Sequence, residues 1–129
     1  MHSRSLVFKV TSIWLVVAGL ALLFPTLGNQ VFDLKLTNWG IASEYGGVLV
    51  GIGALYWYFS MDAERYAPTM ALIAVGLMLN VIVNLYWWSV GHYTVQSAGF
   101  NVVINTLLAG WLWTVKPRSR TKVGESTFS

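Results

Sequence analysis

The sequence predicts an all-α fold: an integral membrane four-helix bundle. The chain has 129 residues, of which 56% are hydrophobic and only 10% are charged, whereas a soluble domain carries roughly 25% charged residues. A bilayer core of about 30 Å is crossed by about 20 helical residues. Apolar stretches near that length occur at residues 10–27, 41–61, 70–90 and 95–115. Each stretch is predicted to span the membrane once, within a single domain covering residues 1–115.

The distribution of basic residues predicts the orientation. Cytoplasmic loops and tails of membrane proteins are enriched in Lys and Arg. With the N-terminus inside, all but one of the eight basic residues are cytoplasmic, and only Lys35 is external. The cytoplasmic set is Arg4, Lys9, Arg65, Lys116, Arg118, Arg120 and Lys122. We therefore expect a multi-pass protein of the inner (plasma) membrane with both termini in the cytoplasm.

The first stretch, residues 10–27, is expected to be a plain helix facing lipid, with Pro25 near its outer end. Cleavage as a signal peptide is disfavoured because the apolar run is longer than about 15 residues and Phe24-Pro25-Thr26 lacks the small residues of a cleavage site. Between residues 28 and 40 apolar and polar residues alternate, which is typical of an extended segment with one apolar face. A partly ordered external loop is the alternative.

The second stretch, residues 41–61, places Glu44, Gly47, Gly51 and Ala54 on one side of a helix. Small residues let transmembrane helices approach closely, so the Gly47/Gly51/Ala54 face is expected to pack within the bundle or against a partner protein or a second copy. Glu44 allows two interpretations. If its side chain faces the bundle interior, Glu44 would be a functional acid. If its side chain reaches external water, it would only be an acidic first-turn residue that the helix dipole favours.

The third and fourth stretches, residues 70–90 and 95–115, follow a short cytoplasmic turn that ends at Pro68, and a brief turn around Gly91 makes them antiparallel neighbours. Reversal at residues 92 and 93 would place Asn80 level with Asn105 and Asn84 level with Asn101. An amide in hydrocarbon must find hydrogen-bond partners. The four asparagines are therefore predicted to form a two-rung ladder with spare capacity for water or a ligand. Residues 116–129 are expected to be a basic disordered tail.

Several kinds of site are not supported. The chain has no cysteine, so iron–sulfur clusters and thiol nucleophiles are ruled out. His2 and His92 would lie at opposite membrane faces, which excludes paired haem ligands from one subunit, and Glu44 has no second metal ligand nearby. No basic folded face suits nucleic acid. No cofactor or metal is expected, catalytic residues are not identifiable, and an enzymatic role is disfavoured.

The overall plan resembles the small four-helix bacterial membrane proteins grouped as BphX-like or DoxX-like. The resemblance rests on Phe24-Pro25, on Glu44-Tyr45-Gly46-Gly47, on Gly51-Ile52-Gly53 and on the basic C-terminal tail. It implies a bacterial inner-membrane location and supplies no catalytic residues.

Two functions follow from these patterns. The first is a non-enzymatic accessory or structural subunit of a membrane assembly, embedded in the lipid bilayer. The alternative is a binder or carrier of a small, mostly apolar molecule, held in an outward-facing polar pocket formed by Glu44, Asn84 and Asn101 with the inner pair Asn80 and Asn105.

Overall fold

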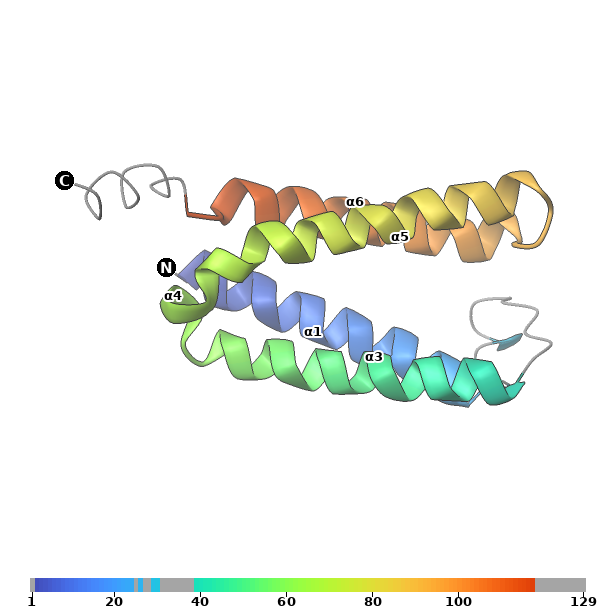
Figure 1. Cartoon of the computed structure of the whole chain (residues 1–129), viewed down its shortest axis with the longest axis horizontal. Coiled ribbons are helices and arrows are strands. Elements are labelled where there is room, and N and C mark those ends of the chain that lie inside the picture. Colours follow the sequence, from blue (N-terminus) through green and yellow to red (C-terminus); the bar gives the residue numbers. More distant parts are fainter. Residues whose placement is uncertain (1, 25, 27–28, 31–38, 118–129) are drawn as a thin grey trace.

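The computed structural model describes residues 2–24, 26, 29–30 and 39–117, and this part is all-helical. Four long helices are joined by a short helix and a 3-10 turn (Figure 1). They are α1 (His2–Leu23), α3 (Trp39–Ser60), α4 (Ala63–Tyr66), η1 (Ala67–Thr69), α5 (Met70–Ser89) and α6 (Val95–Val115). The prediction of an all-α chain with four long helices is confirmed. The extended segment expected at 28–40 and the tail at 116–129 lie mostly outside the described residues.

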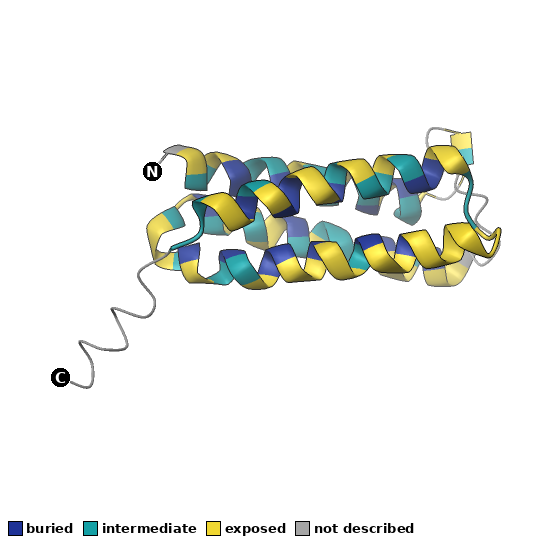
Figure 2. Ribbon diagram, turned by 90° about the horizontal axis from the view of Figure 1, so that it is seen from above, coloured by how far each residue is buried: buried dark blue, intermediate teal, exposed yellow. Residues whose placement is uncertain are grey.

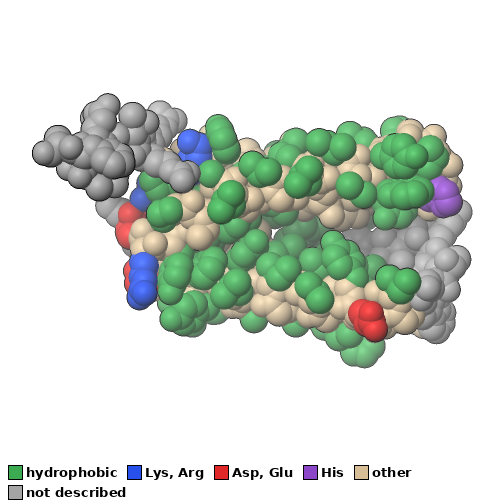
Figure 3. Space-filling view, in the orientation of Figure 1, with side chains coloured by type: hydrophobic (Ala, Val, Ile, Leu, Met, Phe, Trp, Pro, Cys, Tyr) green, Lys and Arg blue, Asp and Glu red, His purple; other side chains and the backbone are tan. Residues whose placement is uncertain are grey.

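Within the described residues, three segments are long and apolar enough to cross a membrane: Ser3–Leu23, Ala63–Ser89 and Val95–Val115. Helix α3 is not among them, because glycines, tyrosines and Glu44 dilute its aliphatic residues. Large apolar side chains are exposed on the outer surfaces, including Leu72, Val95 and Leu107. Figure 2 shows exposed positions along all four long helices, and Figure 3 shows hydrophobic side chains over the visible face. A surface this apolar marks a membrane or protein contact rather than a water-facing exterior. These features are those of a membrane protein.

Helix α1 begins at His2 rather than at Val10, where the apolar stretch starts. Its first turns are polar but find partners at the same end of the bundle. The Arg4 side chain donates from Nε to the Val115 carbonyl (2.8 Å) and from Nη1 to Glu64 Oε1 (2.6 Å). Ser5 Oγ donates to the Ser60 carbonyl (2.9 Å). These bonds tie the helix start to α3, α4 and α6, so the helix extends beyond its hydrophobic stretch.

Helices α1 and α3 form the first antiparallel hairpin, packed through glycines. A Cβ on Gly19 would lie 2.7 Å from the Gly46 carbonyl oxygen, and a Cβ on Gly53 would lie 2.7 Å from Val16 Cγ2. Ser12 Oγ donates to the Gly53 carbonyl (2.6 Å). Such contacts require the two backbones to touch, which only glycine allows.

The predicted packing of the Gly47/Gly51/Ala54 face within the bundle is therefore wrong, whereas its contact with a partner or a second copy stays a prediction. Gly47, Gly51 and Ala54 are exposed, and a Cβ on either glycine would meet nothing within 4 Å. The contact with α1 uses the stripe one residue earlier, through Gly46 and Gly53. Both stripes carry small residues at helical spacing; the stripe that packs is the one whose glycine lies opposite Gly19 of α1.

Helices α5 and α6 form the second antiparallel hairpin, and the turn between them is closed by local hydrogen bonds. Gly91 has a φ of 87°, its N–H bonds the Trp88 carbonyl (3.0 Å), and the His92 N–H bonds the Trp87 carbonyl (2.9 Å). This pattern is a Schellman motif, which favours glycine at the left-handed position. Thr94 Oγ1 then accepts from the Ser97 N–H (3.1 Å) and caps α6.

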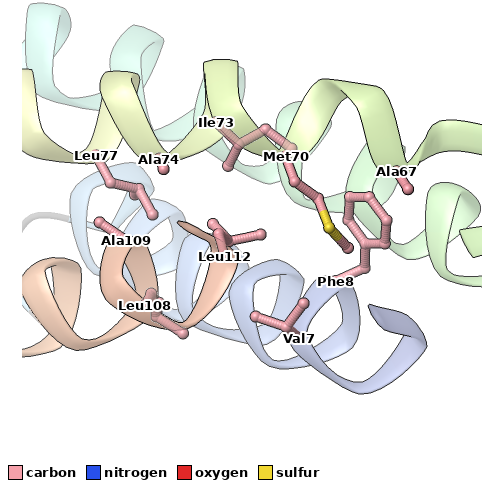
Figure 4. Close-up of a cluster of buried hydrophobic side chains, with 10 residues drawn as sticks. All are labelled: Val7, Phe8, Ala67, Met70, Ile73, Ala74, Leu77, Leu108, Ala109 and Leu112. Atoms are coloured by element: carbon pink, nitrogen blue, oxygen red, sulfur yellow. The ribbon is translucent and has the colours of Figure 1, made fainter. Parts of the chain in front are cut away.

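The two hairpins pack together mainly at the end of the bundle where α1 begins and α6 ends. Their shared core joins α1, η1, α5 and α6 (Figure 4). Its members are Val7, Phe8, Ala67, Met70, Ile73, Ala74, Leu77, Leu108, Ala109 and Leu112. Next to it, Phe59 stacks on Tyr66 with ring centroids 4.4 Å apart. Towards the α5–α6 turn the hairpins diverge (Figure 1). The space-filling view shows a hollow between them (Figure 3).

Candidate functional site

The hollow between the hairpins is a cavity of about 960 Å³, lined by all four long helices and by the α5–α6 turn. Ligand pockets in proteins typically measure about 300–1,000 Å³ and combine apolar walls with a few polar groups. Here the walls are mostly aliphatic and aromatic, as at Leu15, Leu49, Ile52 and Leu72. No Asp, Glu, Lys or Arg of the described residues lines the cavity. The space therefore has the size and composition of a site for an apolar molecule.

All four asparagines of the predicted ladder line this cavity. The inner rung forms, because Asn105 Nδ2 donates to Asn80 Oδ1 at 2.9 Å. Asn105 is buried, and its Oδ1 accepts from Trp14 Nε1 at 2.8 Å. The amides thus connect α5 and α6 with each other and with α1. The predicted level pairing of Asn80 with Asn105 is confirmed.

The outer rung does not form. Asn84 Nδ2 donates along its own helix, to Asn80 Oδ1 (2.9 Å) and to the Asn80 carbonyl (3.1 Å). Asn101 Nδ2 donates to the Ser97 carbonyl (3.0 Å). Each amide finds an acceptor one turn earlier in its own helix, a usual alternative for short polar side chains. The predicted bond between Asn84 and Asn101 is therefore wrong, although both residues line the cavity.

Glu44 does not join the asparagines. It lies on the exposed side of α3 with Gly47 and Gly51, and it is not part of the cavity wall. The expectation that it faces the bundle interior is wrong, because the helix turns its Gly46 side towards α1 instead. A carboxylate in the cavity would also lack a counter-ion, which is costly in an apolar environment. The pocket thus contains the four asparagines without Glu44.

Trp14 is the site residue that the sequence analysis missed, since its helix was expected to be a plain lipid-facing wall. Its indole N–H is the only link between α1 and the amide network among the bonds of the described residues. The sequence carries no clear signal for it, because Trp14 lies as close to the start of its apolar stretch as Trp57 and Trp111 lie to the ends of theirs. A buried indole N–H generally needs a partner, and the structure shows that this partner is on α6.

Tyr45, His92 and Tyr93 line the cavity near the α5–α6 turn, where the hairpins diverge. The rings of Trp87 and His92 meet edge to face with centroids 5.0 Å apart, which holds the turn against α5. Within the described part of the chain, no group of three His, Asp or Glu side chains could hold a metal ion. The chemistry that the site offers is hydrogen bonding from neutral amides, hydroxyls and an imidazole.

Compared with known protein families, curated proteins and solved structures, the chain matches none.

Proposed function

We propose that the protein binds a small, mostly apolar molecule in the cavity between its two helical hairpins. The supporting observation is a cavity of about 960 Å³ with apolar walls and four asparagines in a bundle whose hairpins pack closely only at the opposite end. The space is a pocket that opens to the surroundings of the bundle, so a molecule can enter it. Apolar walls with a few polar groups are the usual composition of a small-molecule site.

Binding is tested by filling the cavity. Gly76 lies in its wall, and a Cβ there would meet nothing within 4 Å, so Gly76→Leu adds a side chain to the cavity without displacing a helix. Gly99→Leu is the matched control, because Gly99 also has open space around its Cβ but does not line the cavity. The probe is 1-pyrenemethanol, added to protein in lipid nanodiscs and followed by energy transfer from tryptophan.

For wild-type protein and Gly99→Leu, energy transfer is expected to saturate as the probe concentration rises. For Gly76→Leu, energy transfer is expected to rise only linearly, because the probe then only partitions into the lipid. Saturable transfer that is the same in all three proteins would show binding elsewhere. Absence of saturation in the wild type would refute the proposal for this class of molecule.

We propose further that the protein lies in the inner membrane with both termini in the cytoplasm. The described basic residues, Arg4, Lys9, Arg65 and Lys116, lie towards the end of the bundle where α1 begins and α6 ends. Figure 3 shows Lys and Arg side chains at that end, and basic residues are retained on the cytoplasmic side. The chain has no cysteine, so single cysteines report topology directly. A membrane-impermeant maleimide should label His92→Cys in intact cells and Asp62→Cys only after lysis. The reverse pattern would invert the topology.

An accessory role in a membrane assembly is the second candidate. It is favoured by the exposed face of α3, where Gly47 and Gly51 have open space around them and would allow another helix to approach closely. Gly47→Leu with Gly51→Leu should release a stoichiometric partner during mild detergent extraction, whereas Gly99→Leu should retain it. A monomer recovered from wild-type membranes without a partner would argue against this role.

A further inference from the structure

The amide orientations in the cavity specify the chemistry of the molecule that fits it. We infer that the cavity selects an uncharged molecule whose polar end both accepts and donates a hydrogen bond, such as an alcohol, a phenol or a carboxamide. This inference rests on the proposed binding function and adds the class of ligand.

The direction of the amide network is set by Trp14. An indole N–H can only donate, so the atom of Asn105 that faces it at 2.8 Å must be the oxygen. The nitrogen of Asn105 is then the atom that meets Asn80, which presents its own oxygen at 2.9 Å. The same Asn80 oxygen accepts from Asn84 Nδ2. The direction of each hydrogen bond in this series is thus fixed by the Trp14 indole, which can only donate.

The two outer amides are oriented by backbone carbonyls, which can only accept. Asn84 directs its nitrogen to the Asn80 carbonyl, and Asn101 directs its nitrogen to the Ser97 carbonyl. Their oxygens are therefore the free ends. No amide in the cavity could be turned over without breaking a bond to a group of fixed role.

These orientations leave a defined set of unused groups. Asn101 and Asn105 each keep a second N–H on a nitrogen that already donates one bond. The Asn80 nitrogen, with two N–H donors, and the carbonyl oxygens of Asn84 and Asn101 have no hydrogen-bond partner among the described residues. These atoms are not sealed off, because Thr11 Oγ1 is the only fully buried side-chain polar atom of the described part that lacks a partner. The cavity thus offers N–H donors from Asn80, Asn101 and Asn105, and carbonyl acceptors from Asn84 and Asn101. A hydroxyl or carboxamide can use both kinds of group.

The absence of charged side chains from the described cavity wall limits the ligand further. An ionised carboxylate, phosphate or amine placed beside the asparagines would lose its hydration without gaining a counter-ion, and this cost greatly exceeds what a few neutral hydrogen bonds return. The polar end of the ligand is therefore neutral, and its apolar body lies against the aliphatic walls.

A series of probes with one aromatic body tests the inference. 1-Pyrenemethanol both donates and accepts, 1-(methoxymethyl)pyrene only accepts, 1-methylpyrene does neither, and 1-pyrenecarboxylate is charged at neutral pH. In the nanodisc assay the alcohol should bind about three- to tenfold more tightly than the ether, and the ether more tightly than the hydrocarbon, since each step removes about one hydrogen bond. The carboxylate should bind at least tenfold more weakly than the alcohol.

The double variant Asn84→Leu with Asn101→Leu removes both acceptors and the spare N–H of Asn101. It keeps the bonds from Trp14 through Asn105 to Asn80 and the free N–H donors of Asn80. Its affinity for the alcohol should fall to that for the ether, while affinity for the ether stays within about twofold of wild type. The unchanged ether affinity shows that the cavity has kept its shape. If the double variant loses affinity for both the alcohol and the ether, its helical content decides between two explanations. Retained helical content would overturn the assignment of Asn84 and Asn101 as acceptors. If helical content falls, the test moves to the single variant Asn101→Leu, whose amide bonds only its own helix and which must lower the ratio of alcohol to ether affinity.

The outcomes separate the two proposals. If no probe binds saturably, the binding function itself fails. If all neutral probes bind with equal affinity and Gly76→Leu blocks them, the binding function stands and the inferred hydrogen-bonding selectivity is refuted. Tighter binding of the carboxylate than of the alcohol would also overturn the inference.

Discussion

Adding one methyl group at Gly46 should destabilise the α1–α3 hairpin, whereas the same change at Gly47 should not. A Cβ on Gly46 would lie 2.5 Å from the Gly19 carbonyl oxygen and closer still to the Leu23 backbone nitrogen. Both are backbone atoms, so no side-chain rotation relieves the overlap and the helices must separate. At Gly47 a Cβ would meet nothing within 4 Å.

The magnitude follows from comparing the two variants. Replacing Gly by Ala inside a helix gains about 1 kcal/mol of helix propensity, and this gain is the same at neighbouring positions of α3. Overpacking a close contact costs about 1–3 kcal/mol. The propensity gain cancels in the difference, so Gly46→Ala should be less stable than Gly47→Ala by about 1–3 kcal/mol, near the upper value because the obstruction is backbone.

The assay is unfolding of the purified protein in mild detergent by increasing amounts of sodium dodecyl sulfate, followed by circular dichroism of the helices. Gly47→Ala should unfold at or above the wild-type midpoint, and Gly46→Ala below it. Equal midpoints for the two variants, or a higher midpoint for Gly46→Ala, would refute the assignment of the Gly46 side of α3 as the packing face.

The same unfolding assay checks three further predictions. Asn105→Leu should cost about 1–3 kcal/mol, because it removes the acceptor of the Trp14 indole N–H and one of the two bonds to Asn80 Oδ1. Asn101→Leu should cost less, since its amide bonds only its own helix. Ser12→Ala removes a buried bond between helices and should cost about 0.6 kcal/mol more than Ser89→Ala, which removes an exposed bond within one helix. Glu64→Gln should change stability by less than about 1 kcal/mol, because the ion pair of this half-exposed carboxylate is solvated, and the effect should shrink with added salt.

Each of these predictions can fail clearly. Equal losses for the two asparagine variants would show that the inner rung adds nothing beyond a local bond. Indistinguishable serine variants would remove the contribution of the bond to the Gly53 carbonyl. A large, salt-independent loss at Glu64 would show that the ion pair is desolvated.

The sequence by itself determined the helical class and the second hairpin. The apolar stretches have the length of spanning helices, and Gly91 and Thr94 mark a turn too short for anything but antiparallel neighbours. Since turn length also limits the register, the level pairing of Asn80 with Asn105 followed from residue numbers alone. All of these features depend on residues close in sequence, or on one tight turn, and local spacing is sufficient for them.

The tertiary structure alone decided which face of α3 meets α1 and what lies between the hairpins. Two stripes of small residues run along α3, and only the position of Gly19 on another helix selects Gly46 over Gly47. That selection turns Glu44 outward. The bond from Trp14 to Asn105 joins residues far apart in the chain, and the cavity exists because the hairpins pack at one end and diverge at the other. Contacts between distant helices depend on the shapes of both surfaces, which the spacing of residues along one helix does not specify.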